Sequence, residues 1–263
     1  MRFPKVSPFH WSLICFVSGG VLIAAGFTTA APLRQARVSE IIRDVKLLAN
    51  HAAARPAAVS DSVTADTAVR TGTESRAELI FNDDTLARVG ANTVFTFDGG
   101  TRSMDLGSGA VLLQVPKGAG GAKISTPAVT AAVTGTTIMF EYNAHAPAKL
   151  MSLEGVGKMC SVKHPDECVI VNAGEISIFT GGHFTKPVKF DVRKVMRSAK
   201  LIRGMKHKLP SLALINQVIR EQGGSGFDEN VTAPDGSVGT IDQRLNSQPP
   251  PPPPPPVRSP PGR

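Results

Sequence analysis

Aromatic side chains that could stack on sugars or nucleobases are nearly absent from this sequence. Among 263 residues there is one tryptophan, Trp11, and one tyrosine, Tyr142. Carbohydrate-binding and single-strand-binding surfaces usually stack their ligands on such rings. The composition therefore argues against a lectin and against a nucleic-acid platform, and we expect no nucleic acid among the partners.

Motifs of catalytic chemistry are also missing. The sequence contains no phosphate-binding loop, no dinucleotide-binding fingerprint and no His-Glu zinc helix. The histidines beyond residue 30 stand in loops or polar segments without a nucleophile motif, and Asp83-Asp84 and Asp166-Glu167 have the ordinary composition of turns. We therefore predict a protein that is not an enzyme and carries no cofactor.

Cysteine is scarce, and only Cys160 and Cys168 lie beyond the first thirty residues. The seven residues between them join two strand-like runs, so a hairpin would bring the sulfurs to disulfide distance. We predict that disulfide, given an oxidising compartment. The alternative is a Cys-x3-His-x3-Cys zinc site that includes His164, for which a fourth donor must come from neighbouring acids or a remote histidine.

The first thirty residues have the composition of an export signal. Arg2 and Lys5 precede an apolar run from Trp11 to Phe27, which small residues follow. This order predicts a signal peptide cleaved after Ala30 and a periplasmic or secreted product. The alternative is an uncleaved inner-membrane anchor, because the apolar run approaches the lower length limit of a bilayer-spanning helix.

The chain is basic, with a formal net charge of +8. Removal of residues 1–30 takes away Arg2 and Lys5 and no acid, which leaves +6. In an exported protein this balance favours anionic surfaces such as lipid headgroups, cell-wall polymers or an acidic protein partner.

Residues 69–178 form a succession of short β-type runs that turn residues separate about every ten positions. This pattern predicts an all-β fold, an antiparallel β-sandwich or β-roll of many short strands. Within one run, Ala77, Leu79 and Phe81 should face the core, and Arg76 and Glu78 the other side of the strand.

Two runs, Val111–Val115 and Val129–Val133, are apolar on both faces, so we expect cover on both sides of these strands. Glycines between the runs are expected to supply turns. They are Gly72, Gly90, Gly107, Gly109 and Gly135.

The segments that flank the β block are less regular. Val38–Leu48 suits either a strand or a helix, and we favour an opening strand, followed by an exposed link over Arg55–Asp66. After the block, Asp191 can cap a first amphipathic helix that Pro210 ends, and a second precedes Gly223-Gly224. The chain finishes in a proline-rich stretch that we predict to be a disordered spacer.

The first of these helices is strongly cationic. Arg193, Arg197, Lys200 and Arg203 are the candidate residues for contact with an anionic membrane surface or an acidic partner. The alternative is that the apolar stripe of the helix packs on the β domain while these charges face water.

An ordered series of motifs resembles the FecR domain. The motifs are Val69-Arg70-Thr71-Gly72, Ser75–Phe81, Arg88–Thr93, Leu106–Val115, Ile124-Ser125-Thr126-Pro127 and Thr134-Gly135-Thr136-Thr137. The resemblance covers roughly residues 67–180. At Asn82-Asp83-Asp84-Thr85, where the family commonly has an Asp-Gly turn, the glycine is missing.

The resemblance implies an extracytoplasmic, all-β, non-enzymatic module. Its founding members relay iron-siderophore status from an outer-membrane transporter to a sigma factor that a cytoplasmic domain holds. Only about ten residues precede the apolar run here, so the chain is similar to the stand-alone exported members.

The predicted organisation has five parts: a signal peptide (1–30), an N-terminal strand and linker (31–66), a FecR-like β domain (67–182), a basic helical appendix (183–224) and a proline-rich tail (225–263). We expect a sensor or scaffold that binds a protein of the cell envelope. The alternative is a membrane-anchored regulator that relays an envelope signal to a transmembrane partner.

Overall fold

The computed structural model describes residues 31–50 and 52–224, so the predicted export signal and proline-rich tail lie outside the described residues. In these ranges the chain forms strands β1 (Gln35–Ile42), β2 (Val45–Ala49), β3 (Arg55–Pro56), β4 (Ser62–Thr64), β5 (Thr67–Thr71), β6 (Arg76–Phe81), β7 (Leu86–Val89), β8 (Val94–Phe97), β9 (Ser103–Gln114), β10 (Ala122–Ser125), β11 (Val129–Val133), β12 (Thr137–Asn143), β13 (Ala146–Glu154), β14 (Val156–Ser161), β15 (Cys168–Asn172), β16 (Glu175–Thr180), β17 (His183–Phe184) and β18 (Val188–Lys189). The helices are α1 (Val192–Ser198), α2 (Lys200–Arg203) and α3 (Leu212–Glu221).

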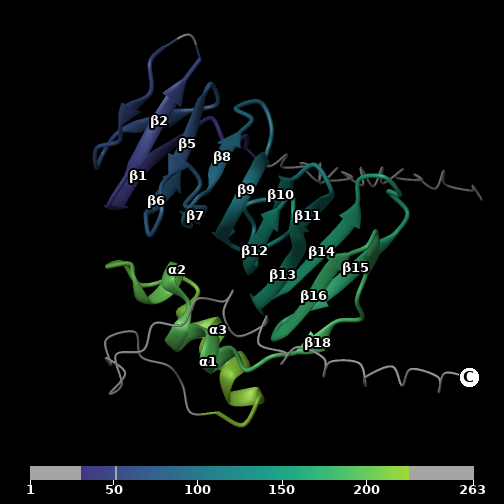
Figure 1. The fold of residues 1–263 in the computed structure, drawn as a ribbon. Coiled ribbons are helices and arrows are strands. Elements are labelled where there is room, and N and C mark those ends of the chain that lie inside the picture. The colour runs from purple at the N-terminus through teal and green to yellow at the C-terminus, as the bar shows by residue number, and fades with distance from the viewer. Residues whose placement is uncertain (1–30, 51, 225–263) are drawn as a thin grey trace, which may run out of the picture.

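The strands form two layers that share β9 (Figure 1). The first sheet has the order β4-β1-β6-β7-β9-β12-β13-β16, with β17 and β18 paired to β16. The second has the order β3-β2-β5-β8-β9-β10-β11-β14-β15. All these pairs are antiparallel except β9–β10. The predicted all-β class is confirmed.

Successive side chains of a strand point to opposite faces of its sheet. The apolar side chains on the inner faces of the two sheets pack against each other and form the core. Ala77, Leu79 and Phe81 of β6 are buried there, as predicted. Phe81 of the first sheet meets Phe97 of the second edge to face, with ring centroids 5.0 Å apart. The rings therefore mark direct contact between the layers.

Strand β9 passes from one sheet to the other without a break. Its first half pairs with β8 and β10, and its second half with β7 and β12. We predicted two strands with a turn at Gly107 and Gly109, and this was wrong: both glycines lie inside β9. Gly109 has a φ of +99°, which glycine adopts without a steric penalty and which lets the strand continue into the second pairing.

A third layer of helices covers the outer face of the first sheet. Leu112, Met139 and Met151 of the sheet pack against helix residues that include Met196 and Ile215. Figure 1 shows the three helices together on one side of the strands. The apolar face of the predicted helical appendix is therefore buried on the β domain.

The helix ends follow the predicted signals in part. The Asp191 carboxylate accepts a hydrogen bond from the Lys194 amide at 2.9 Å and caps α1. Ala199, in extended conformation, divides the predicted first helix into α1 and α2. No described helix, in residues 31–50 and 52–224, is long and apolar enough to cross a bilayer.

We predicted that the strands at Val111–Val115 and Val129–Val133 are buried on both faces, and this is confirmed for the first of them. Val111 and Leu113 face the sheet interface, while Leu112 faces the helices. In the run Val129–Val133 the expectation was wrong, because outward-facing Thr130 is half-buried and Ala132 exposed. The second run lies in the second sheet, away from the helical layer.

The segment before residue 67 is integrated into both sheets. β1 pairs with β6, and β2 pairs with β5. Residues 55–66, predicted as an exposed link, contribute β3 and β4, and Val63 is fully buried.

Candidate functional site

A buried ion pair lies on the helix-covered face of the first sheet. Glu78 of β6 and Arg88 of β7 are direct cross-strand partners, and Arg88 Nε donates to Glu78 Oε2 at 2.8 Å. Neither side chain is exposed to solvent. Arg88 also donates to the backbone carbonyls of Leu201, at 3.1 Å, and His207. The pair therefore fastens the helical segment to the sheet.

The second carboxylate oxygen of Glu78 is engaged as well. Ser39 Oγ donates to Glu78 Oε1 at 2.7 Å, and His207 Nδ1 lies 2.7 Å from the same oxygen. Burial by itself raises the pKa of Glu78, but the hydrogen bond from Ser39, the charge of Arg88 and the bonds from His207 and Arg88 bring it below the usual range. Glu78 is therefore stabilised as an anion.

Glu40 completes what we call the polar cluster: Ser39, Glu40, Glu78, Arg88 and His207. Glu40, Glu78 and Arg88 are buried, Ser39 is half-buried and His207 is exposed. The Oε2 of Glu40 accepts the Lys206 amide proton at 2.8 Å. The cluster thus joins β1, β6 and β7 to the chain between α2 and α3.

Glu40, Glu78 and His207 place potential metal-ligand atoms within 4.8 Å of one another. Carboxylates with an imidazole suit a divalent cation in kind. However, both oxygens of Glu78 already accept hydrogen bonds, and a guanidinium beside them would repel a cation. The arrangement fits an ion pair that holds the layers together better than a metal centre.

A cleft of about 240 Å³ opens on the same face, between strand ends of the first sheet and α2. Met139, Met151 and Leu201 supply apolar lining, and Arg76 of β6 supplies a cation. The Nε of Arg76 is buried without a hydrogen-bond partner among the described residues. This combination distinguishes the cleft from the satisfied polar cluster beside it.

A smaller polar contact lies under the start of α3. Thr137 Oγ1 is 2.8 Å from Glu154 Oε1 and 2.6 Å from Ser211 Oγ. Glu154 is almost fully buried, and this burial raises its pKa, although Thr137 and Lys117 act in the opposite direction. Glu154 therefore costs stability when it is ionised.

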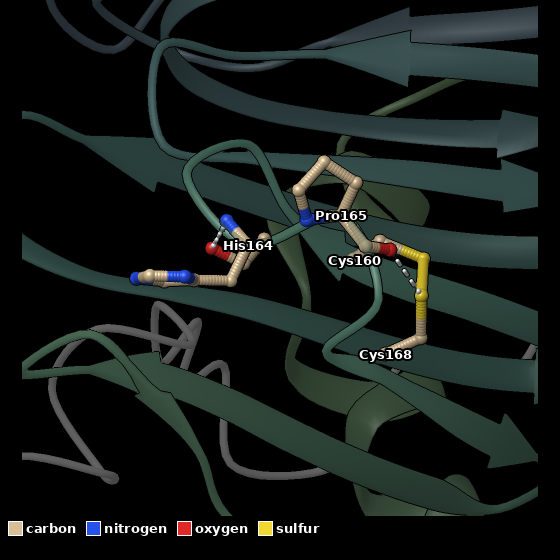
Figure 2. Close-up of a disulfide and its surroundings, with 5 residues drawn as sticks. Cys160, His164, Pro165 and Cys168 are labelled. Atoms are coloured by element: carbon tan, nitrogen blue, oxygen red, sulfur yellow. Dashed lines mark hydrogen bonds between the residues drawn. A yellow bond between two sulfur atoms is a disulfide. The ribbon is translucent and has the colours of Figure 1, made fainter.

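The predicted disulfide is present. Cys160 of β14 and Cys168 of β15 are cross-strand partners and are bonded to each other, with their Cα atoms 4.1 Å apart. In Figure 2 the His164 ring points away from the two sulfurs. The structure therefore brings together the two cysteines and not the alternative zinc ligand set.

The four candidate cationic residues do not share one environment. Arg193 and Arg197 belong to α1, and Arg197 is exposed while Arg193 is half-buried. Lys200 and Arg203 of α2 are also half-buried, and Lys200 Nζ forms an ion pair with Glu74 at 2.7 Å. Their contact with an anionic surface stays a prediction.

Sequence reasoning placed Glu78 on the side of β6 opposite the core but did not find its partner. A usable signal was present. Glu78 and Arg88 stand equally far from Asp83, so a hairpin centred on the Asn82–Asp84 turn pairs them. Alternation identifies the face of a strand, but not the layer that covers it.

Residues 31–50 and 52–224 therefore form three layers, with a polar cluster and a neighbouring cleft on the helix-covered face of the first sheet. Residues 67–156 match the family model described as FecR protein. The chain thus carries a FecR domain, as its motifs predicted.

No protein among the curated sequences matches the chain. Among solved structures it is similar to two crystal structures described as an anti-sigma factor from Parabacteroides distasonis. The identities are 15% and 14%, each with a TM-score of 0.44. The similarity covers 49% of this chain and 63% and 62% of those chains. The chain therefore spans less than two thirds of either.

Proposed function

We propose that this protein is an exported, non-catalytic FecR-like module that acts as a sensor or scaffold and binds another protein in the cell envelope. The observation that carries the proposal is the FecR domain at residues 67–156. Its resemblance to signalling members extends the proposal to iron-linked, TonB-type signalling.

The buried helices favour a protein partner over a lipid surface. A helix that lies on a membrane needs an apolar face to place among the lipids. In α3 that face consists of Ile215, Val218 and Ile219, and all three are buried against the body. The apolar residues of the appendix thus serve internal packing, which leaves its charges and the neighbouring cleft for contact.

The test is cross-linking in the envelope of cells that produce the full chain with a C-terminal tag. We expect one discrete cross-linked product that contains an envelope protein, and oxidised Cys160 and Cys168. A product found in the cytoplasm with both thiols reduced would contradict the proposal. Loss of an iron-dependent reporter response on gene deletion would test the signalling part.

The alternative proposal is a membrane-anchored regulator, which the apolar run from Trp11 to Phe27 favours. N-terminal sequencing of the mature protein separates the two. Ala31 as the first residue supports export, and retention of Met1 or Arg2 supports the anchor.

A further inference from the structure

We propose that the cleft beside α2 receives an acidic side chain of the partner protein, and that Arg76 binds its carboxylate. The inference builds on the proposed function, since it names the contact surface for the envelope partner. It depends on the charges, burial and shape of the cleft.

The charged side chains that line the cleft carry one positive charge in excess. Glu74 pairs with Lys200 at 2.7 Å, and Glu141 with Lys149 at 3.4 Å. Arg76 is the remaining charged residue of the lining. The Arg76 Nε has no hydrogen-bond partner among the described residues, and Glu74, the carboxylate of the lining that acts on Arg76 through its charge, is hydrogen-bonded to Lys200. A single carboxylate would therefore balance the charge of the cleft.

Arg76 is partly withdrawn from water. Its side chain is half-buried, and burial lowers its pKa. The charge of Glu74 opposes this shift, the charge of Arg43 adds to it, and the charge of Glu40 opposes it. A desolvated guanidinium whose Nε lacks a hydrogen bond is unfavourable, and a ligand carboxylate can accept two strong hydrogen bonds from it at once. The missing hydrogen bond at Arg76 Nε therefore points to an anionic ligand.

Gly204 explains how the guanidinium fits beneath the end of α2. A Cβ atom at position 204 would lie 2.7 Å from Arg76 Nη2 and 2.9 Å from Cζ. The glycine thus allows the chain to pass directly over the guanidinium. Gly204 therefore leaves the space that the Arg76 guanidinium occupies beside α2.

The apolar lining indicates what accompanies the carboxylate. Met139, Met151 and Leu201 line the cleft beside Arg76, and methionine adapts its shape to varied contacts. A cavity of about 240 Å³ is smaller than the ~300–1,000 Å³ of small-molecule sites. The cleft therefore suits an Asp or Glu with an adjacent apolar side chain better than a cofactor.

A phosphate group is less well matched. Glu74 and Glu141 lie in the lining, and a doubly charged anion would be repelled by both while only one cation is in excess. We therefore assign the cleft to a carboxylate, and phosphate serves as a comparison in the test.

The test uses the full chain and two synthetic peptides, acetyl-Ala-Leu-Asp-Leu-Ala-amide and its Asn counterpart. Binding is followed by NMR of the arginine Nε–H groups. We expect the Arg76 signal to shift and the Asp peptide to bind about tenfold or more tightly than the Asn peptide, the value of a charge-assisted hydrogen bond.

The controls are two substitutions of matched chemistry. Arg76→Gln should abolish the preference for Asp, whereas Arg70→Gln, which changes an exposed arginine of the second sheet, should leave it intact. Circular dichroism and thermal melting check that both variants are folded. Equal binding of the two peptides, no binding of either, or tighter binding of inorganic phosphate at Arg76 would each overturn the inference.

A second arm separates this inference from the proposed function. If the envelope cross-link forms equally with wild type and Arg76→Gln, the cleft assignment fails and the proposed function stands. If no cross-link forms with wild type, the proposed function fails, and the peptide titration still decides whether Arg76 binds a carboxylate.

Discussion

Glu78 and Arg88 face each other across the β6–β7 hairpin and form an ion pair, 2.8 Å long, that solvent does not reach. Through Arg88 this pair also holds the carbonyls of Leu201 and His207, more than a hundred residues further along the chain. The attachment of the helical layer is therefore specified from within the FecR domain.

Arg88→Ala should destabilise the protein by about 3–5 kcal/mol, because it leaves the Glu78 carboxylate buried without its counter-charge. Urea denaturation measures the loss. Replacing both partners by similarly sized neutral residues, Glu78→Gln with Arg88→Met, should cost less than Arg88→Ala alone. The exposed Arg70→Ala should change stability by no more than about 0.5 kcal/mol. An equal effect of Arg88→Ala and Arg70→Ala would contradict the structural role.

Glu78 should make the protein sensitive to acid. Its folded-state pKa lies below the usual value of 4.5, so the unfolded chain binds the proton more readily. The stability that the ionised Glu78 contributes is complete above pH 4.5 and is lost as the pH falls through its folded-state pKa. Free energies of unfolding measured over this acid range should decline more steeply for wild type than for Glu78→Gln. Parallel curves would rule out the assignment.

Glu154 should act in the opposite direction. Its folded-state pKa is raised above 4.5, so its contribution is complete below that pH and is lost as the pH rises through the folded-state pKa. At neutral pH, Glu154→Gln should therefore stabilise the protein, by about 1 kcal/mol, the scale of a typical single substitution. Thermal melts at neutral and acid pH measure the effect. A gain of the same size at acid pH would show that charge is not the cause.

Loss of the disulfide should weaken the β14–β15 hairpin. Cys160→Ala with Cys168→Ala should cost about 2–3 kcal/mol, the chain-entropy value for so short a loop. Denaturation with and without reductant provides the comparison, and reductant should leave the double variant unchanged. A wild type that is insensitive to reductant would show that the bond adds no stability.

Gly109→Ala should be among the most damaging small substitutions in the chain. A Cβ atom there would lie 2.1 Å from Thr93 Oγ1 and 2.7 Å from Thr93 Cα, on a backbone with φ +99°. We expect a loss above about 3 kcal/mol, since steric strain and an unfavourable φ act together. Gly118→Ala is the control, because it has a positive φ but open space around it. Comparable melting temperatures would refute the steric argument.

Much of the β domain could be predicted because local chemistry determines it. Apolar alternation placed Ala77, Leu79 and Phe81 in the core. The Asn82–Asp84 turn forms without a glycine, with Asp84 at a φ of +62° that Asp tolerates. The disulfide followed from the spacing of two cysteines and the expected export.

The remaining features depend on contacts between distant parts of the chain. Alternation gave the correct side of β6 for Arg76 and Glu78, but a charged residue on that side is ordinarily solvated. Only the later helices make Glu78 fully buried and leave the Arg76 Nε without a partner. The continuity of β9 could not be predicted for a similar reason. Gly107 and Gly109 indicate a turn in the sequence, and only the pairing of β9 with strands of both sheets shows that the strand continues through them.

The way the strands pair has a practical consequence for work on isolated fragments. The family match begins at residue 67 and ends at residue 156, yet β6 needs β1, β5 needs β2, and β11 needs β14 as neighbours. β13 likewise needs β16, so an excised 67–156 polypeptide would have four strands without a neighbour, and unpaired strand edges invite aggregation. A fragment that keeps every described strand pair and the helices that cover the first sheet runs from residue 31 to residue 224. It is much longer than the segment that matches the family.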